Sequence, residues 1–172
     1  MTLLKRMRRN DAPCPHPCKT PALEIAGRFL HEAPVDLLAM ASRLGLSVTM
    51  DAALGPGISG RIRRQDNSYH IEVNGAHSPN RRRFTLAHEI AHYLLHRDLI
   101  GDGIEDDALY RSPLGGQIES EANHLAAQML MPGPLVRNLY RNGLRSLAAL
   151  CGAFQVSEEA MRIRLKQLRL AP

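Results

Sequence analysis

The segment of the chain best suited to chemistry is His88-Glu89-Ile90-Ala91-His92. On a helix, residues four apart lie on one face with their Cβ atoms about 6 Å apart, so both imidazole rings can reach one tetrahedral ion. Glu89 projects beside the pair and can take a proton from a water molecule held at such an ion. The alternative for the same pentapeptide is a surface helix with two solvated histidines.

The residues on either side of this segment favour the metal-binding interpretation. Ser78-Pro79 predicts a helix start, with a side-chain oxygen cap followed by proline at the first helical position, and the helix should run to about His96. Apolar residues flank the motif on this helix, which predicts that it is largely buried. Two buried histidines are costly without a metal ion or hydrogen-bond partners.

A catalytic zinc normally takes a third protein ligand and keeps a fourth position for water. His96 is excluded, because eight helical residues separate it from His88 by about 12 Å. A second predicted helix, over residues 117–131, offers Glu119 and Glu121. We expect Glu119 to be the ligand and Glu121 to project away, with a solvated charge at a helix start as the alternative for Glu119.

The choice of Glu119 depends on its neighbours along that helix. Glu119 lies at helical spacing with Ala122 and Ala126, on a small-residue face that can pack closely against another helix. Asn123 is one turn later on the same side. Its amide oxygen is expected to accept the second N–H of a ligating histidine and so to fix the tautomer of that ring.

These segments resemble the ImmA/IrrE family of metallo-endopeptidases. The resemblance rests on residues 60–74, 83–96 and 119–132, and together with 34–48 it extends over about residues 25–170. It implies one zinc ion (Zn2+) on His88, His92 and Glu119, with Glu89 as the general base. It also implies a protein substrate, typically a DNA-binding repressor whose cleavage relieves repression.

The same resemblance implies an α+β fold: a small mixed or antiparallel sheet of about three strands packed on a helical zincin-like core. We expect a flexible N-terminal arm over 1–20, the metallopeptidase core over 21–132, and a helical, helix-turn-helix-like subdomain over 133–172. The elements predicted from periodicity and caps are helices at 21–31, 36–44, 78–96, 117–131, 135–140, 144–151 and 158–168, and strands at 46–50, 58–64 and 69–73.

Substrate contacts are harder to predict. The strand at 69–73 is expected to be a sheet edge whose residues Tyr69, His70 and Ile71 pair with an extended peptide, although an ordinary edge is an equal alternative. For the oxyanion stabiliser, the candidates from residue type are His70, Tyr93, Tyr110, Arg111 and His124.

Composition bounds the remaining possibilities. The chain has 172 residues, a net charge of +5 and 4% aromatic residues, values that fit one soluble domain. No apolar run approaches the roughly 18 residues needed to cross a bilayer, and the basic N-terminus lacks the apolar segment of a secretion signal, so a cytoplasmic protein with no membrane contact is expected.

A rival function remains open: a non-catalytic, zinc-stabilised accessory protein that binds a repressor or DNA. The predicted helix at 158–168 is basic, as in a DNA reader, but a solvated basic face around an apolar stripe is the commoner case. Cys14, His16 and Cys18 are too few for a second zinc site and are more typical of an extended arm. The intact Glu89 favours catalysis, because a purely structural zinc site needs no base.

Overall fold

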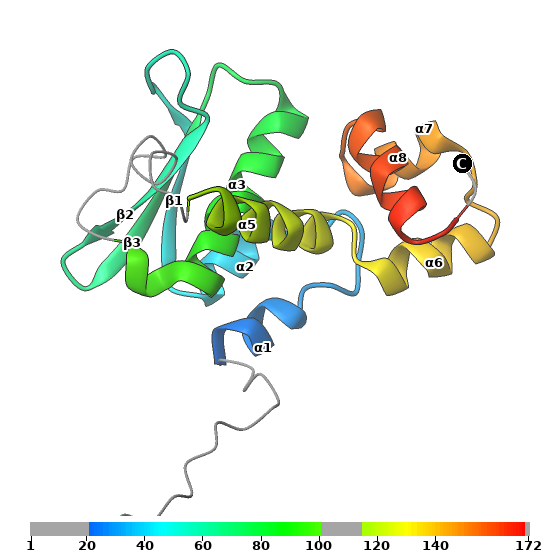
Figure 1. Cartoon of the computed structure of the whole chain (residues 1–172), viewed down its shortest axis with the longest axis horizontal. Helices are drawn as coiled ribbons and strands as arrows, with labels where there is room; N and C mark the ends of the chain where they lie inside the picture. The colour runs from blue at the N-terminus through cyan, green and yellow to red at the C-terminus, as the bar shows by residue number, and fades with distance from the viewer. Residues whose placement is uncertain (1–20, 101–114, 171–172) are drawn as a thin grey trace, which may run out of the picture.

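Within the described part of the chain, the sheet has three strands and mixed direction. The computed structural model describes residues 21–100 and 115–170. Its strands are β1 (Leu46–Ala52), β2 (Gly60–Gln65) and β3 (Ser68–Asn74), in the order β1-β3-β2. β3 runs parallel to β1 and antiparallel to β2 (Figure 1). The α+β class and the small mixed sheet predicted from the sequence are confirmed.

The position of β3 differs from the expectation. β3 is the central strand and is paired along its length on both sides, so the prediction that Tyr69–Val73 forms a sheet edge is wrong. The alternation of apolar residues correctly indicated a strand with one buried face. It carried no information about which strands lie on either side, because β1 joins β3 through a long-range parallel pairing. The edges of this described sheet are β1 and β2.

Helix α3 (Pro79–His96) covers the inner face of the sheet. The side chains that meet there are fully or almost fully buried, with Ile71 and Val73 from β3 and Leu86 and Ile90 from α3 exposed by 2% or less. The helix begins at Pro79 as predicted, but the hydroxyl of Ser78 makes no capping bond. The proline ring, whose φ already suits the first helical turn, therefore marks this helix start without side-chain capping.

Helix α5 (Gly115–Leu130) packs directly on α3. The two alanines of its predicted small-residue face, Ala122 and Ala126, are completely buried. Side chains that end at Cβ let the two helix backbones approach closely, which carries Glu119, one turn before Ala122, into the contact between the helices. This packing confirms the prediction of a small-residue face.

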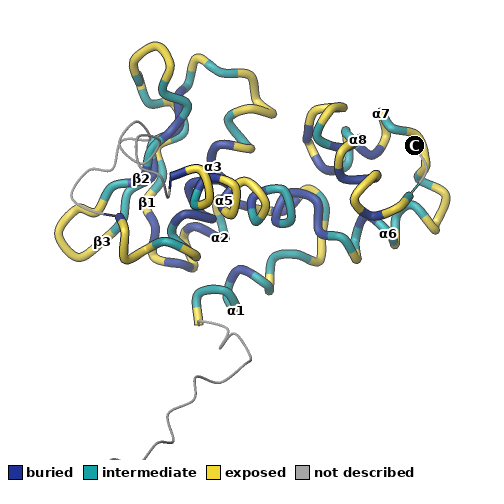
Figure 2. Tube along the Cα trace, in the orientation of Figure 1, coloured by how far each residue is buried: buried dark blue, intermediate teal, exposed yellow. Residues whose placement is uncertain are grey.

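The C-terminal helices α6 (Gly133–Arg141), α7 (Leu147–Phe154) and α8 (Glu158–Gln167) gather on the side of α5 remote from the sheet (Figure 1). Each of these helices has buried positions along its trace (Figure 2). The buried apolar residues include Val136, Leu150, Phe154, Met161 and Leu165. Ser157 caps α8 as predicted, since its hydroxyl accepts a hydrogen bond of 3.2 Å from the Ala160 amide.

Short elements complete the described chain. They are α1 (Pro21–Gly27), α2 (Leu37–Arg43), which Asp36 caps by accepting from the Ala39 amide at 2.9 Å, and the 3-10 turn η1 (Arg97–Leu99). In residues 21–100 and 115–170 no helix is both long and apolar enough to cross a membrane. The predicted arm at 1–20 and the candidates Cys14, His16, Cys18, Tyr110 and Arg111 lie outside the described residues.

Candidate metal centre

Helix α3 presents His88 and His92 side by side on its face toward α5. Their Nε2 atoms are 2.9 Å apart, and their ring planes meet at 82° with centroids 4.5 Å apart. Both residues are buried, at 8% and 4% exposure. The i, i+4 spacing on a regular helix is enough to produce this arrangement, as the sequence predicted.

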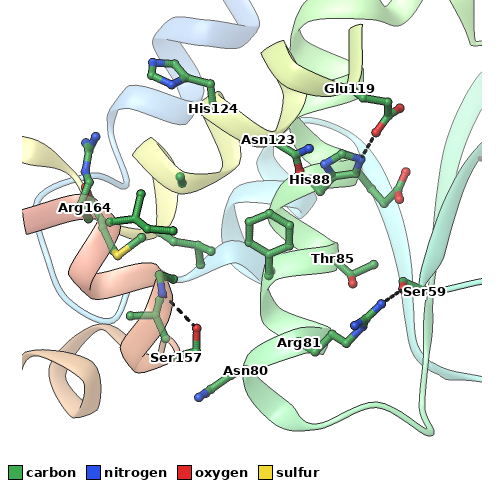
Figure 3. A pocket seen from close by; sticks show the side chains of 18 of the residues that line it. Ser59, Asn80, Arg81, Thr85, His88, Glu119, Asn123, His124, Ser157 and Arg164 are labelled. Atoms are coloured by element: carbon green, nitrogen blue, oxygen red, sulfur yellow. Dashed lines mark hydrogen bonds and ion pairs between the residues drawn. The ribbon is translucent and has the colours of Figure 1, made fainter. Parts of the chain in front are cut away.

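Glu119 of α5 completes the cluster. Its Oε2 lies 3.2 Å from His88 Nε2, and its Oε1 lies 3.2 Å from His92 Nε2. One ligand atom from each of the three residues can be chosen so that all lie within 4.8 Å of one another. Figure 3 shows the carboxylate of Glu119 turned toward the ring of His88. Glu121 projects away, as expected, and lies 3.1 Å from His96 Nε2.

The three side chains fit a divalent metal ion of the zinc type. Tetrahedral bonds of about 2.0–2.2 Å to nitrogen and oxygen place neighbouring ligand atoms about 3.3 Å apart, close to the separations of 2.9–3.2 Å in the cluster. Two imidazoles and one carboxylate are also the donor set of many catalytic zinc sites. Three protein ligands leave a fourth coordination position for water or substrate.

The electrostatics of the cluster suit the same purpose. Burial alone would raise the pKa of Glu119, but the interactions with His88 and His92 outweigh it and lower this pKa to about 2. Glu119 is therefore an ionised carboxylate throughout the neutral range. Metal ligation requires deprotonated ligands, and Glu119 already meets that condition.

Glu89 lies against the start of strand β2. It is 2% exposed, and a Cβ added to Gly60 would come within 3.4 Å of its Oε1. The close approach that requires glycine at position 60 is to Thr85, whose Cγ2 would lie 2.3 Å from that Cβ, and the Glu89 carboxylate lies beside the same position. Both Glu89 and His88 border the same cleft, so the carboxylate faces the space that leads to the metal ligands rather than bulk solvent.

With this geometry described, comparison with known proteins identifies the family. The model of the M78 peptidases, described as an IrrE N-terminal-like domain, matches residues 41–166. The chain belongs to this family. The match includes His88, Glu89, His92 and Glu119, and it extends through most of α8.

Individual relatives are more distant. This M78 member is 38% identical, over 107 residues, to the radiation response metalloprotease IrrE of Deinococcus radiodurans, and the aligned part is 59% of this chain and 32% of that protein. The chain therefore spans about a third of the curated relative. Among solved structures, a Mycobacterium tuberculosis transcriptional regulator matches at a TM-score of 0.53 and 22% identity, over 76% of this chain and 39% of that one. That likeness concerns the fold alone.

The cleft of this M78 member has a volume of about 830 Å³ and runs between α3, α5 and α8. His88 and Glu119 lie on one side of it, and Ser157 and Arg164 lie on the other (Figure 3). Its size is in the range typical of ligand-binding clefts. Two of the three cluster residues, His88 and Glu119, thus border an open space that can admit a chain segment.

Asn123 also borders the cleft, but not in its predicted role. It is exposed, and no hydrogen bond joins it to either histidine in the described structure. The Nδ1 atom of His88 is buried and has no hydrogen-bond partner among the described residues. The prediction that Asn123 fixes a histidine tautomer is therefore wrong. One turn along α5 from Glu119, its side chain points into the cleft instead.

The expected substrate residues of β3 lie elsewhere. Tyr69, His70 and Ile71 do not border the cleft. Ile71 is fully buried, and the imidazole of His70 lies between the hydroxyls of Ser47 and Thr49, at 2.7 and 3.1 Å. Because β3 is central and its side chains alternate between the two faces of the sheet, neither its backbone nor these side chains can meet a peptide at the metal site.

The candidate oxyanion residues are also separated by the fold. His70 is remote from the cleft, and Tyr93 packs edge-on against the ring of Tyr69, with the centroids 5.1 Å apart. Among the candidates in the described chain, His124 alone borders the cleft, with its Nε2 2.7 Å from Gln128 Nε2.

Several residues of the cleft have no obvious signal in the sequence. Thr85 lies beside Gly60, and Arg81 donates to the Ser59 hydroxyl at 2.9 Å at the cleft rim (Figure 3). The larger omission is the wall formed by α8, whose position depends on packing between distant parts of the chain. The sequence shows the i, i+3/i+4 stripe of α8. It does not show the cleft that this stripe faces.

Proposed function

We propose that this M78 member is a zinc-dependent endopeptidase that cleaves a protein regulator of transcription. The proposal depends above all on one observation: two buried imidazoles and a buried, ionised carboxylate converge at 2.9–3.2 Å beside an open cleft, which His88, Glu119 and the second buried carboxylate, Glu89, border. Structural zinc sites use four protein ligands, whereas three ligands and a neighbouring base are the pattern of catalytic sites.

In this proposal His88, His92 and Glu119 hold the ion. When bound, zinc supplies a Lewis acid that makes a water molecule acidic near neutral pH and polarises the scissile carbonyl. Glu89 takes the proton from the attacking water and returns it to the leaving amine. Its confinement between α3 and Gly60 holds its carboxylate toward the ligands, and this preorganisation removes the need for a rearrangement during the reaction.

The substrate backbone is proposed to align on the edge of β2. The Ser59 carbonyl accepts from the Asn74 amide at 2.9 Å, so alternation directs the backbone groups of Gly60 toward the open side of β2. Glu89 lies at the face of β2 toward which a Cβ at Gly60 would point. An extended peptide paired there would carry its scissile bond past the base and the metal ligands.

The protein regulator as substrate is supported by family membership and by the metalloprotease IrrE as a relative. We also propose the division into a zincin-like core over 21–132 and a helix-turn-helix-like subdomain over 133–172. It is consistent with α6–α8 burying a set of apolar side chains of their own.

The test separates metal binding from catalysis. The purified chain is expected to bind one equivalent of zinc and to cleave a candidate regulator at a defined bond, as read by metal analysis and mass spectrometry. Glu89→Gln should keep the zinc and lose at least about 100-fold in cleavage rate, because general-base catalysis typically contributes 10²–10⁴-fold. A Glu89→Gln protein that cleaves like the wild type would refute the proposal. Zinc binding without any cleavage by the wild type would favour the accessory-protein alternative.

A further inference from the structure

One helix stripe of the C-terminal part bounds the cleft on the side opposite the metal ligands. The α8 residues that border the cleft recur every three or four positions and include Ala160, Ile163, Arg164 and Gln167. This spacing is that of one helix face. The apolar side chains Met161 and Leu165 occupy a different face of α8 and are buried against the other C-terminal helices. The packing of Met161 and Leu165 thus uses a different face of α8 from the one that carries Ile163.

Two large apolar side chains of the cleft are exposed to solvent. They are Phe84 of α3, at 36% exposure, and Ile163 of α8, at 53%. The almost fully buried apolar residues Leu130 and Met131 border the same cleft. Apolar side chains gathered in a concave site with a few polar groups are typical of ligand recognition.

The position of Phe84 relates this apolar surface to the reaction. Its ring stacks on the ring of His88, with centroids 6.2 Å apart and planes 28° from parallel. An extended peptide advances about 3.3–3.6 Å per residue. A side chain that contacts Phe84 therefore belongs to a residue within about two positions of the peptide bond held at the metal ligands.

The α8 wall is fixed to the core by hydrogen bonds. Arg164 is buried, and its Nε donates to the carbonyl of Met131, just after α5, at 2.9 Å. Arg137 of α6 donates to the carbonyl of Leu168, just after α8, at 2.9 Å. The first bond holds α8 against the end of α5, and the second holds the end of α8 against α6. The space between α3 and α8 is therefore a preformed part of the fold.

We propose that Phe84 and Ile163 form a specificity subsite, which takes a large aliphatic or aromatic side chain of an extended peptide within two residues of the cleaved bond. This inference rests on the proposed peptidase function and names the substrate feature that the function would select. The occupant is a peptide side chain because Phe84 stacks on His88 and borders the same cleft as Ile163.

A DNA-reading role for α8 is the competing use of this helix. Its first turn carries Glu158 and Glu159, and a recognition helix places these N-terminal positions at the bases and phosphates, where negative charge is unfavourable. The face with Ile163 is turned toward the cleft rather than outward. The peptide is therefore the occupant that the charges and the geometry favour.

The experiment measures cleavage preference with the full chain loaded with zinc and a library of peptides randomised on both sides of the bond. The wild type should prefer large apolar residues at one position within two residues of the cut. Ile163→Ala should reduce the preference for leucine over alanine there by about tenfold, the effect of a few methylene contacts. Ile163→Lys should transfer the preference to acidic residues, a gain that misfolding cannot produce.

Arg162→Ala is the matched control. Arg162 is exposed next to Ile163 on α8, does not border the cleft, and pairs with Glu158 at 3.6 Å. It should retain the wild-type preference. Binding of the same library to the Glu89→Gln variant measures the preference without turnover, so the subsite is tested even where cleavage is absent.

The outcomes distinguish the two proposals. Apolar selectivity in binding with no cleavage by the wild type would refute the peptidase and leave the subsite supported. Cleavage with no apolar preference, or an Ile163→Lys variant with the wild-type preference, would overturn the subsite alone. Duplex DNA binding that is lost in Ile163→Lys would also overturn it, because α8 would then serve as a DNA reader.

Discussion

Replacing Gly60 by alanine tests how closely β2 and α3 must approach for Glu89 to be held in place. A Cβ at position 60 would lie 2.3 Å from Thr85 Cγ2, 3.0 Å from the Glu72 carbonyl oxygen and 3.4 Å from Glu89 Oε1. Ordinary carbon contacts are about 3.5–4.0 Å. The Thr85 methyl group must therefore retreat by more than about 1 Å. Thr85 is 5% exposed and β-branched, so it has little rotamer freedom with which to do so.

The strain should pass to the site through α3. Thr85 is one helical turn before Glu89 and three residues before His88, so a retreat of Thr85 moves both side chains relative to β2. Overpacking of this kind costs about 1–3 kcal/mol of unfolding free energy. A displacement of about 1 Å in a catalytic group can lower the rate by about 100-fold. We expect Gly60→Ala to show both losses and still to bind zinc, because His88, His92 and Glu119 shift less relative to one another.

The assay combines urea unfolding, zinc titration and kcat/KM on a cleaved peptide. Thr85→Ser removes the clashing methyl group and keeps the hydroxyl, so the Gly60→Ala, Thr85→Ser double variant should regain most of the lost stability and activity. Gly55→Ala is the matched control, since nothing lies within 4 Å of a Cβ added there. Full activity in Gly60→Ala, or no recovery in the double variant, would refute the reasoning.

Three further outcomes are expected. Glu119→Gln should weaken zinc binding by more than about 100-fold, because changes to residues outside the ligand set already cost about 10–100-fold. Zinc should raise the melting temperature of the wild type but not that of the variant. Equal zinc affinities of the two proteins in calorimetric titration would exclude Glu119 as a ligand. The side-chain hydrogen bond from Arg61, at 2.7 Å, lowers the pKa of Glu72, with help from Arg63 and against partial burial, so Glu72→Gln should cost about 1 kcal/mol near pH 7. The difference should shrink as the pH falls below 4.5, the ordinary glutamate value, and disappear only below the lowered pKa of Glu72; a pH-independent difference in urea unfolding would contradict the ion pair. Gly152 is an exposed residue of α7, and nothing lies within 4 Å of a Cβ added there. Gly152→Ala should therefore raise the free energy of unfolding by about 0.5–1 kcal/mol, and a decrease in urea unfolding would show that α7 is not helical at this position.

The metal cluster was largely predictable because most of it depends on local geometry. The spacing of His88 and His92 needs only a regular helix, and the apolar flanks indicated that this helix is buried. Glu119 required a longer inference, from the small residues Ala122 and Ala126 to close packing of two helices. That inference succeeded because small buried side chains leave few other ways to pack two helices.

The incorrect predictions concern long-range arrangement. The alternation of apolar and polar residues along β3 showed which of its side chains are buried. The strand order depends instead on the long-range parallel pairing of β1 with β3, which this alternation does not record. Asn123 was expected at a histidine because it lies on the same side of α5 as Glu119. However, each residue turns the helix by about 100°, so residues four apart differ by about 40° in direction, enough to move Asn123 from the helix contact into the cleft. The wall formed by α8 depends on the path of the chain between α5 and α8, which no local pattern records.

The contact between α3 and α5 links stability to the geometry of the metal cluster. α3 brings His88 and His92 together by its own regularity, whereas the separations of 3.2 Å to Glu119 depend on how closely α5 approaches. That approach is set by Ala122 and Ala126, which are fully buried and touch no ion. An added methylene there would separate the helices and move the carboxylate outward, because packed interiors transmit such changes over short distances. The geometry of the cluster of His88, His92 and Glu119 is thus set as much by two alanines as by the three side chains themselves.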